Sequence, residues 1–127
     1  MIRDFLIINC IGNNDKLGLR INKDFFVHNC KKKEVSKEDL VSEIVNFLKK
    51  SKALIDENFS VIVNLGPGSF SGIRISLAIA KGLEISKNIK LFGYYNENLK
   101  TFDLENIEKM LSKNLIEKKL IKPIYLS

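Results

Sequence analysis

A continuous apolar segment, residues 59–65, runs directly into a glycine-rich turn, and that turn runs into a long apolar helix. An uninterrupted apolar strand is typical of a parallel strand that is buried on both faces. The helix is expected to extend to about Ser86, and residues 90–95 form the next apolar segment. These segments predict a βαβ unit with two neighbouring parallel strands and a right-handed crossover.

The first thirty residues predict a different arrangement, in which short strands follow one another through tight turns. Gly12–Asp15 and Asn22–Lys23 are turn sequences, so the strands that flank them are expected to form an antiparallel meander. A helix is expected from Ser36 to about Lys52, and Asp103 is expected to cap a last helix. The stripe of that last helix is Leu104, Ile107, Leu111 and Leu115, and the expected meander strands are Asp4–Cys10, Leu17–Ile21 and Phe25–His28.

The predicted fold class is therefore α/β, with the order β-β-β-α-β-α-β, a C-terminal helix and a mixed five-stranded sheet. Pro123 is expected to stop any continuation of the last helix and leave a short tail. No apolar segment is long enough for a membrane helix, which predicts a soluble, cytoplasmic chain with no membrane partner. We expect residues 1–127 to form a single domain.

Composition excludes several function classes. The net charge is +6, but the cations are scattered, and the cluster Lys31–Lys33 is interpreted as a solvated loop rather than a nucleic-acid site. The two cysteines, Cys10 and Cys30, are too few for a disulfide scaffold and are expected to be free. The spacing of β-strands places the first and third strands about 10 Å apart, too far for a bridge. The single histidine, His28, is interpreted as structural, so no metal site is predicted.

The glycine turn raises the question of a phosphate site. Gly66, Gly68 and Gly72 are spaced one residue too far for the dinucleotide fingerprint, and Gly72 is not followed by the lysine of a P-loop. Pro67 removes one of the backbone donors that an anion would need. The chemistry favours a tight strand-to-helix turn whose helix is capped by Ser69 or Ser71.

The helix after the turn has apolar residues in nearly every direction, so it must be covered on more than one side. Small residues recur four apart within it, which would let a second helix approach closely. We expect Gly72, Ser76, Ala78 and Gly82 to form a flat track for a partner helix, framed by Arg74 and Lys81.

The segment GPGSFSGIRISLAIAKGLE resembles the signature of the TsaB (YeaZ) family, which is close to GPGSFTGLRIGLATAKGLA. The strand IKLFGY and the ending KPIYLS are also similar to that family. In this chain the signature loop is Gly66, Pro67, Gly68, Ser69, Phe70 and Gly72.

The resemblance implies a ribonuclease H-like (actin-like ATPase) lobe in a non-catalytic subunit of the complex that makes threonylcarbamoyladenosine in tRNA. It implies pairing with TsaD through the first two helices, alongside TsaE, and only an indirect relation to tRNA. The implied interface comprises Leu40, Ile44, Phe47, Gly72, Arg74, Ser76, Leu77, Ala78, Lys81 and Gly82.

The chain also departs from that family. Asn9 stands where the first strand usually carries an acid, and the His-x-x-x-His motif of the sister family TsaD is absent near Tyr95. Residues 102–127 are expected to hold only a residual helix and tail in place of most of a second domain. Because nucleotide binds between two lobes in actin-like ATPases, we expect no catalytic, cofactor-binding or metal-binding residues. Two alternatives stay open: a small nucleotide- or metal-dependent hydrolase that uses the glycine loop, and a homodimer that uses the same helices.

Overall fold

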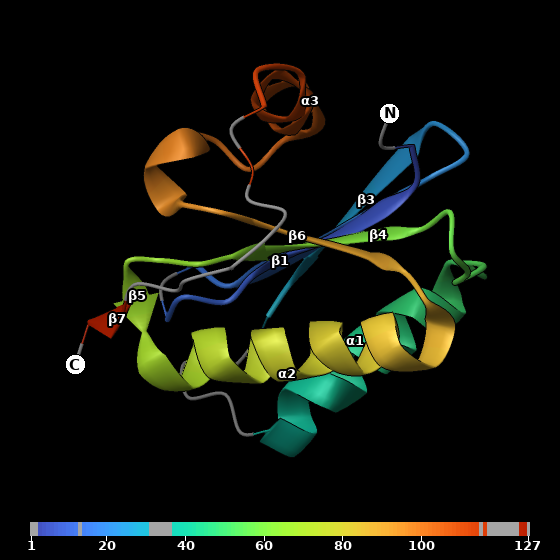
Figure 1. The fold of residues 1–127 in the computed structure, drawn as a ribbon, viewed down its shortest axis with the longest axis horizontal. Helices are drawn as coiled ribbons and strands as arrows, with labels where there is room; N and C mark the ends of the chain where they lie inside the picture. Colours follow the sequence, from blue (N-terminus) through green and yellow to red (C-terminus); the bar gives the residue numbers. More distant parts are fainter. Residues whose placement is uncertain (1–2, 13, 31–36, 115, 117–124, 127) are drawn as a thin grey trace.

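A five-stranded mixed sheet with helices on both faces forms the centre of the computed structural model (Figure 1). The structure describes all residues except 1–2, 13, 31–36, 115, 117–124 and 127. The strand order is β3-β2-β1-β4-β6. The strands are β1 (Phe5–Asn9), β2 (Lys16–Ile21), β3 (Asp24–Asn29), β4 (Ser60–Asn64) and β6 (Lys90–Tyr94).

The pairing of the strands confirms the predicted topology. β1 pairs antiparallel with β2, and β2 pairs antiparallel with β3, while β4 runs parallel to both β1 and β6. Every residue of β4 is buried, as the uninterrupted apolar segment predicted. The fold class predicted from the sequence is therefore confirmed.

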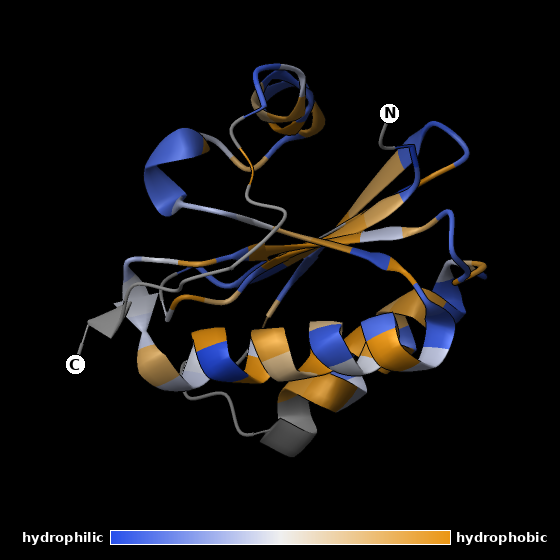
Figure 2. Ribbon diagram, in the orientation of Figure 1, coloured by the Kyte–Doolittle hydropathy of each residue, from blue (hydrophilic) through white to orange (hydrophobic). Residues whose placement is uncertain are grey.

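Two helices cover one face of the sheet (Figure 1). They are α1 (Lys37–Lys50) and α2 (Phe70–Lys87), and α2 ends at Asn88, which adopts a left-handed conformation with φ of 58°. The strands between the helices are mostly hydrophobic, whereas α2 alternates hydrophobic and hydrophilic residues along its length (Figure 2). The main core lies between these two helices and the sheet.

The other face of the sheet is covered by α3 (Leu104–Ser112), which packs on a second cluster that includes Phe5, Ile62 and Tyr94 (Figure 1). The Asp103 side chain accepts a hydrogen bond from the Asn106 backbone N–H at 2.8 Å, which confirms the predicted cap. A short 3₁₀ helix, η1 (Asn96–Asn98), precedes α3. The predicted cap at Ser36, the stripe residue Leu115 and the stop at Pro123 lie outside the described residues.

A small two-stranded sheet was not predicted. β5 (Gly68–Ser69) lies within the glycine loop and pairs in parallel with β7 (Tyr125–Leu126), with Gly68 opposite Tyr125. The segment interpreted as a tail therefore includes a strand that pairs with the glycine loop. This pairing places the last described residues of the chain beside the beginning of α2 (Figure 1).

Candidate functional site

The glycine loop is held by hydrogen bonds to the rest of the lobe. Gly66 has φ of 98°, which favours glycine, and its peptide bond to Pro67 is cis. The Gly66 N–H donates to the Asn64 Oδ1 atom at 2.9 Å, and the Gly66 carbonyl accepts from the Asn96 N–H at 2.8 Å. Both polar backbone groups of Gly66 are therefore already paired within the chain.

The end of the loop is fixed in the same way. The Ser69 N–H donates to the Ile11 carbonyl at 2.7 Å, and a Cβ added to Gly68 would lie 2.5 Å from the Ile11 Cβ atom. Ser69 occupies the N-cap position of α2 and no side-chain capping bond forms there, so the prediction that Ser69 or Ser71 caps the helix is wrong. The Ser69 hydroxyl lies 3.3 Å from that of Ser71, which is exposed in the first turn.

A buried asparagine joins three segments at the carboxyl ends of the parallel strands. Asn64, which is 1% exposed, donates from Nδ2 to the Oδ1 atoms of Asn9 at 2.7 Å and Asn96 at 3.2 Å. Together with its bond to Gly66, it links β1, the glycine loop and η1. Sequence reasoning missed this network, because its members are far apart in the chain and no pattern marks them.

Tyr94 lies on the same side of the sheet and is also buried. Among the described residues its hydroxyl makes no hydrogen bond of good geometry. Burial raises the pKa of Tyr94, and the neighbouring Asn64 side chain offsets only part of this effect. The group therefore stays neutral in the folded chain at ordinary pH.

The first part of the predicted track on α2 faces the sheet rather than a partner. Gly72 and Ser76 are buried, and the Ser76 hydroxyl donates to the Gly72 carbonyl at 2.7 Å. A Cβ added to Gly72 would lie 2.3 Å from the Cys10 carbonyl oxygen, so glycine is needed for β1 and α2 to pack this closely. The small residues do mark a close approach, but the approach is to this chain's own backbone.

The predicted interface residues of α1 are also part of the core. Leu40, Ile44 and Phe47 are buried against the sheet and α2, and Leu77 of α2 is half-buried against the same cluster. The wide apolar stripe of α1 is therefore largely covered within this chain, and these side chains do not form an exposed surface as expected.

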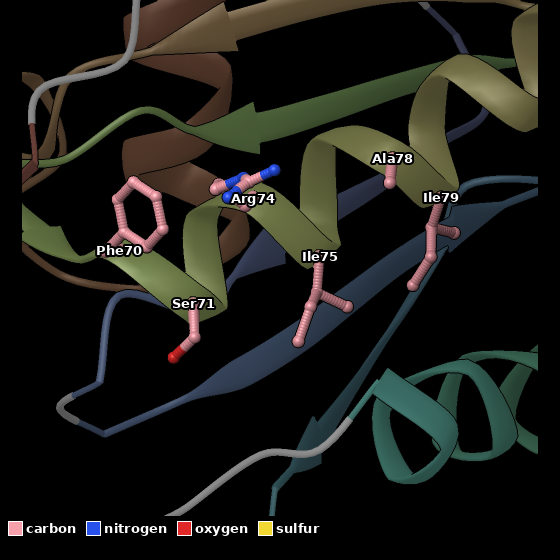
Figure 3. A pocket seen from close by; sticks show the side chains of 6 residues that line it. All are labelled: Phe70, Ser71, Arg74, Ile75, Ala78 and Ile79. Atoms are coloured by element: carbon pink, nitrogen blue, oxygen red, sulfur yellow. The ribbon is translucent and has the colours of Figure 1, made fainter.

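The remaining predicted residues, Arg74, Ala78, Lys81 and Gly82, are exposed on α2. Two rows of side chains border a groove of about 450 Å³ on this side of the helix (Figure 3). Ser71, Ile75 and Ile79 point to one side of α2 and form one row, and the other row is Phe70, Arg74 and Ala78.

Arg74 gives this groove a positive charge at a defined place. Its guanidinium carbon lies 4.9 Å from the centre of the Phe70 ring, which is the geometry of a cation–π contact. Phe70 is 47% exposed despite being a large aromatic residue. The groove thus combines an apolar lining with one oriented cation, a combination suited to a partner surface that is apolar and carries an acid.

Comparisons with known proteins show which proteins this chain resembles. No protein-family model matches the chain. Two curated relatives match, both called tRNA threonylcarbamoyladenosine biosynthesis protein TsaB, from two subspecies of Buchnera aphidicola. The relative from subspecies Schizaphis graminum is 38% identical over 65 residues, and the relative from subspecies Baizongia pistaciae is 40% identical over 50 residues. Over these segments the chain is similar to the TsaB family.

Solved TsaB-family structures share the fold. YeaZ from Pseudomonas aeruginosa superposes with a TM-score of 0.68 at 14% identity, over 76% of this chain and 46% of that one. A second Pseudomonas aeruginosa structure, described as similar to peptidase YeaZ, gives a TM-score of 0.67 over 45% of its length. The sequence matches cover 51% and 39% of this chain but only 30% and 23% of the two curated TsaB relatives.

The two cysteines, Cys10 and Cys30, are free, as predicted, although they interact. A hydrogen bond with the Cys30 side chain, together with burial, raises the pKa of the Cys10 thiol. The two side chains therefore lie closer together than the spacing of their strands suggested.

His28 lies beside α1, with its Nε2 atom 3.5 Å from the Glu43 carboxylate and its ring 5.7 Å from that of Phe47. Within the described part of the chain, no group of three or more His, Cys, Asp or Glu side chains could hold a metal ion. The same part contains no helix that is both long and apolar enough to cross a membrane.

Proposed function

We propose that this chain is a non-catalytic scaffold subunit in tRNA threonylcarbamoyladenosine biosynthesis, and that it binds TsaD through the exposed side of α2. The matched TsaB relatives are named for this pathway, which supports the process. The groove along α2 supports the mode of binding and is the observation on which the proposal rests.

The proposed interface is narrower than the one expected from the sequence. It comprises the exposed row Phe70, Arg74 and Ala78 with the neighbouring Ile75 and Ile79. A partner helix that lies along this groove would cover large apolar side chains and could place a carboxylate on Arg74. Desolvated contacts of this kind carry most of the binding energy in protein interfaces.

The loop geometry supports a scaffold role over a nucleotide-dependent hydrolase. A phosphate cradle needs backbone N–H groups that point outward. In this loop the N–H groups of Gly66 and Ser69 donate to Asn64 and Ile11, and Pro67 has none. We therefore expect the purified chain neither to hydrolyse ATP nor to bind it with micromolar affinity, which calorimetry would measure.

Ala78→Arg tests the interface directly. Ala78 is exposed, so the substitution should leave folding intact, but the new side chain would fill the groove. We expect the affinity for the TsaD protein of the same organism to fall at least tenfold, or about 1.4 kcal/mol. Arg74→Glu, which reverses the one charge and removes the contact with Phe70, should have a similar effect.

Leu54→Arg is the matched control, because Leu54 is 78% exposed and lies outside both helices. It introduces the same side chain on another surface and should leave TsaD binding unchanged. Binding would be followed by calorimetry or co-elution, and folding by thermal unfolding. Wild-type affinity in both α2 variants, with normal unfolding, would show that TsaD does not bind this groove.

A further inference from the structure

The two edges of the central sheet differ sharply in exposure. At one edge, Leu91, Phe92, Gly93 and Tyr94 of β6 are all buried, so the backbone of that edge is covered. At the other edge, β3 is largely exposed. Two large apolar residues of β3 are among the exposed ones, Phe26 at 44% and Val27 at 45%.

The hydrogen bonds of β3 show which backbone groups face outward. Just beyond the strand, the Cys30 N–H donates to the Asp15 carbonyl at 2.9 Å, in the same register as the pairs between β2 and β3. Because this direction alternates along an antiparallel strand, residues 24, 26 and 28 are bonded toward β2. Phe25, Val27 and Asn29 direct their N–H and C=O groups outward, and in the described part of the chain no hydrogen bond reaches them.

This edge lacks several of the features that usually prevent edge-to-edge pairing. β3 contains no proline and no lysine, and its six residues pair with β2 without a bulge. Exposed edges of this length and regularity are templates for another strand.

We propose that a second copy of this chain pairs antiparallel with β3, with Phe26 opposite Phe26 of the second copy. The sides of the strand restrict the register to pairings that are centred on a single residue. His28 packs against Phe47 on the α1 side and Phe25 packs against Phe5 on the opposite side, so even and odd residues of β3 face different sides of the sheet. A twofold axis through a continuous sheet must place residues of the same side opposite each other, and pairing centred on Phe26 satisfies this condition.

The proposed register is complementary along its whole length. Phe25 of each copy lies opposite Val27 of the other copy, and the backbone groups of both residues point outward. Each of these two pairs therefore exchanges two backbone hydrogen bonds. The exposed Val27 meets an aromatic side chain, and the exposed Phe26 meets its own copy in a close, non-hydrogen-bonded pair. Asp24 lies opposite His28 of the second copy, so no like charges oppose each other within the strand. This pairing does not use the α2 groove and does not depend on the proposed function.

Two matched substitutions distinguish dimerisation through the β3 edge from binding through the α2 groove. Phe26 and Phe70 are the same residue type at 44% and 47% exposure, one on β3 and one on α2. Phe26→Lys would place like charges opposite each other across the twofold axis, whereas Phe70→Lys changes only the groove. Sedimentation equilibrium of the full chain, from about 1 to 300 μM, would resolve micromolar dimer dissociation constants.

We expect a wild-type dimer in this range, a dissociation constant at least tenfold higher for Phe26→Lys, and a change of less than twofold for Phe70→Lys. Only Phe70→Lys should weaken TsaD binding, so failure of the β3 pairing and failure of the TsaD proposal are distinguishable. A wild-type chain that stays monomeric, or a dimer that Phe70→Lys dissociates as strongly as Phe26→Lys, would overturn the proposal.

A cross-link provides a second measurement that does not rely on weakening the dimer. Phe26→Cys should form a disulfide between two copies of residue 26 after mild oxidation, because non-hydrogen-bonded pairs bring Cα atoms within bridging distance. Phe70→Cys is the control. Mass spectrometry should identify the 26–26 linkage, and its absence while the 70–70 linkage forms would exclude pairing along β3.

Discussion

Gly72→Ala should destabilise the fold, because α2 lies directly against the backbone of β1 at this position. The added Cβ would lie 2.3 Å from the Cys10 carbonyl oxygen and 3.2 Å from its carbon, and a backbone atom cannot rotate away as a side chain can. Overpacking of this kind costs about 3 kcal/mol at the upper end of its usual range. Alanine in place of glycine stabilises a helix by about 1 kcal/mol, so the free energy of unfolding should fall by a net amount of about 2 kcal/mol.

Gly82→Ala is the matched control on the same helix. A Cβ at Gly82 would meet nothing within 4 Å, so only the helical preference remains and stability should rise by about 0.5–1 kcal/mol. For a chain of this size each kcal/mol shifts the melting temperature by about 4 °C. Thermal unfolding should thus show a fall of about 8 °C for one variant and a small rise for the other. An unchanged or higher melting temperature for Gly72→Ala would refute the close packing of α2 on β1.

Three further outcomes are expected. Asn64→Ala should lower the free energy of unfolding by about 2–3 kcal/mol in denaturant titrations, because it leaves the buried Gly66 N–H without its acceptor. Above about pH 10, where an ordinary tyrosine ionises, stability should fall with rising pH, because Tyr94 ionises in the unfolded chain while its raised pKa keeps it protonated in the folded one. Tyr94→Phe should remove this component of the pH dependence, which unfolding at several alkaline pH values would test. In the native protein Cys10 should resist alkylation while the half-buried Cys30 reacts, and mass spectrometry would detect the reverse order if this is wrong.

The sequence predicted the fold well where burial and turn chemistry agree. The apolar segment 59–65 could be assigned to a buried parallel strand because a half-exposed strand would alternate. Short turns allowed only antiparallel neighbours for the first three strands. β7 was missed because a strand of two residues carries no periodicity, and its pairing with Gly68 depends on the path of the chain between them.

The candidate site was predicted only in part. The apolar residues of α2 surround the helix, so periodicity could not show which side faces the sheet. Gly72 and Ser76 were interpreted as part of a track for a partner helix, but small residues do not reveal whether the neighbour is a strand of the same chain or a helix of another. Ile75 and Ile79 line the groove and were missed, because in the sequence they resemble ordinary core residues.

The contact between Gly72 and the Cys10 carbonyl also bears on binding kinetics. A helix held this tightly against a strand keeps its exposed rows in place before any partner arrives. A partner of this face would therefore dock as a rigid body, and its association rate constant should lie in the ordinary range of about 10⁵–10⁷ M⁻¹s⁻¹. Substitutions along the exposed rows would then change the lifetime of the complex far more than the speed at which it forms.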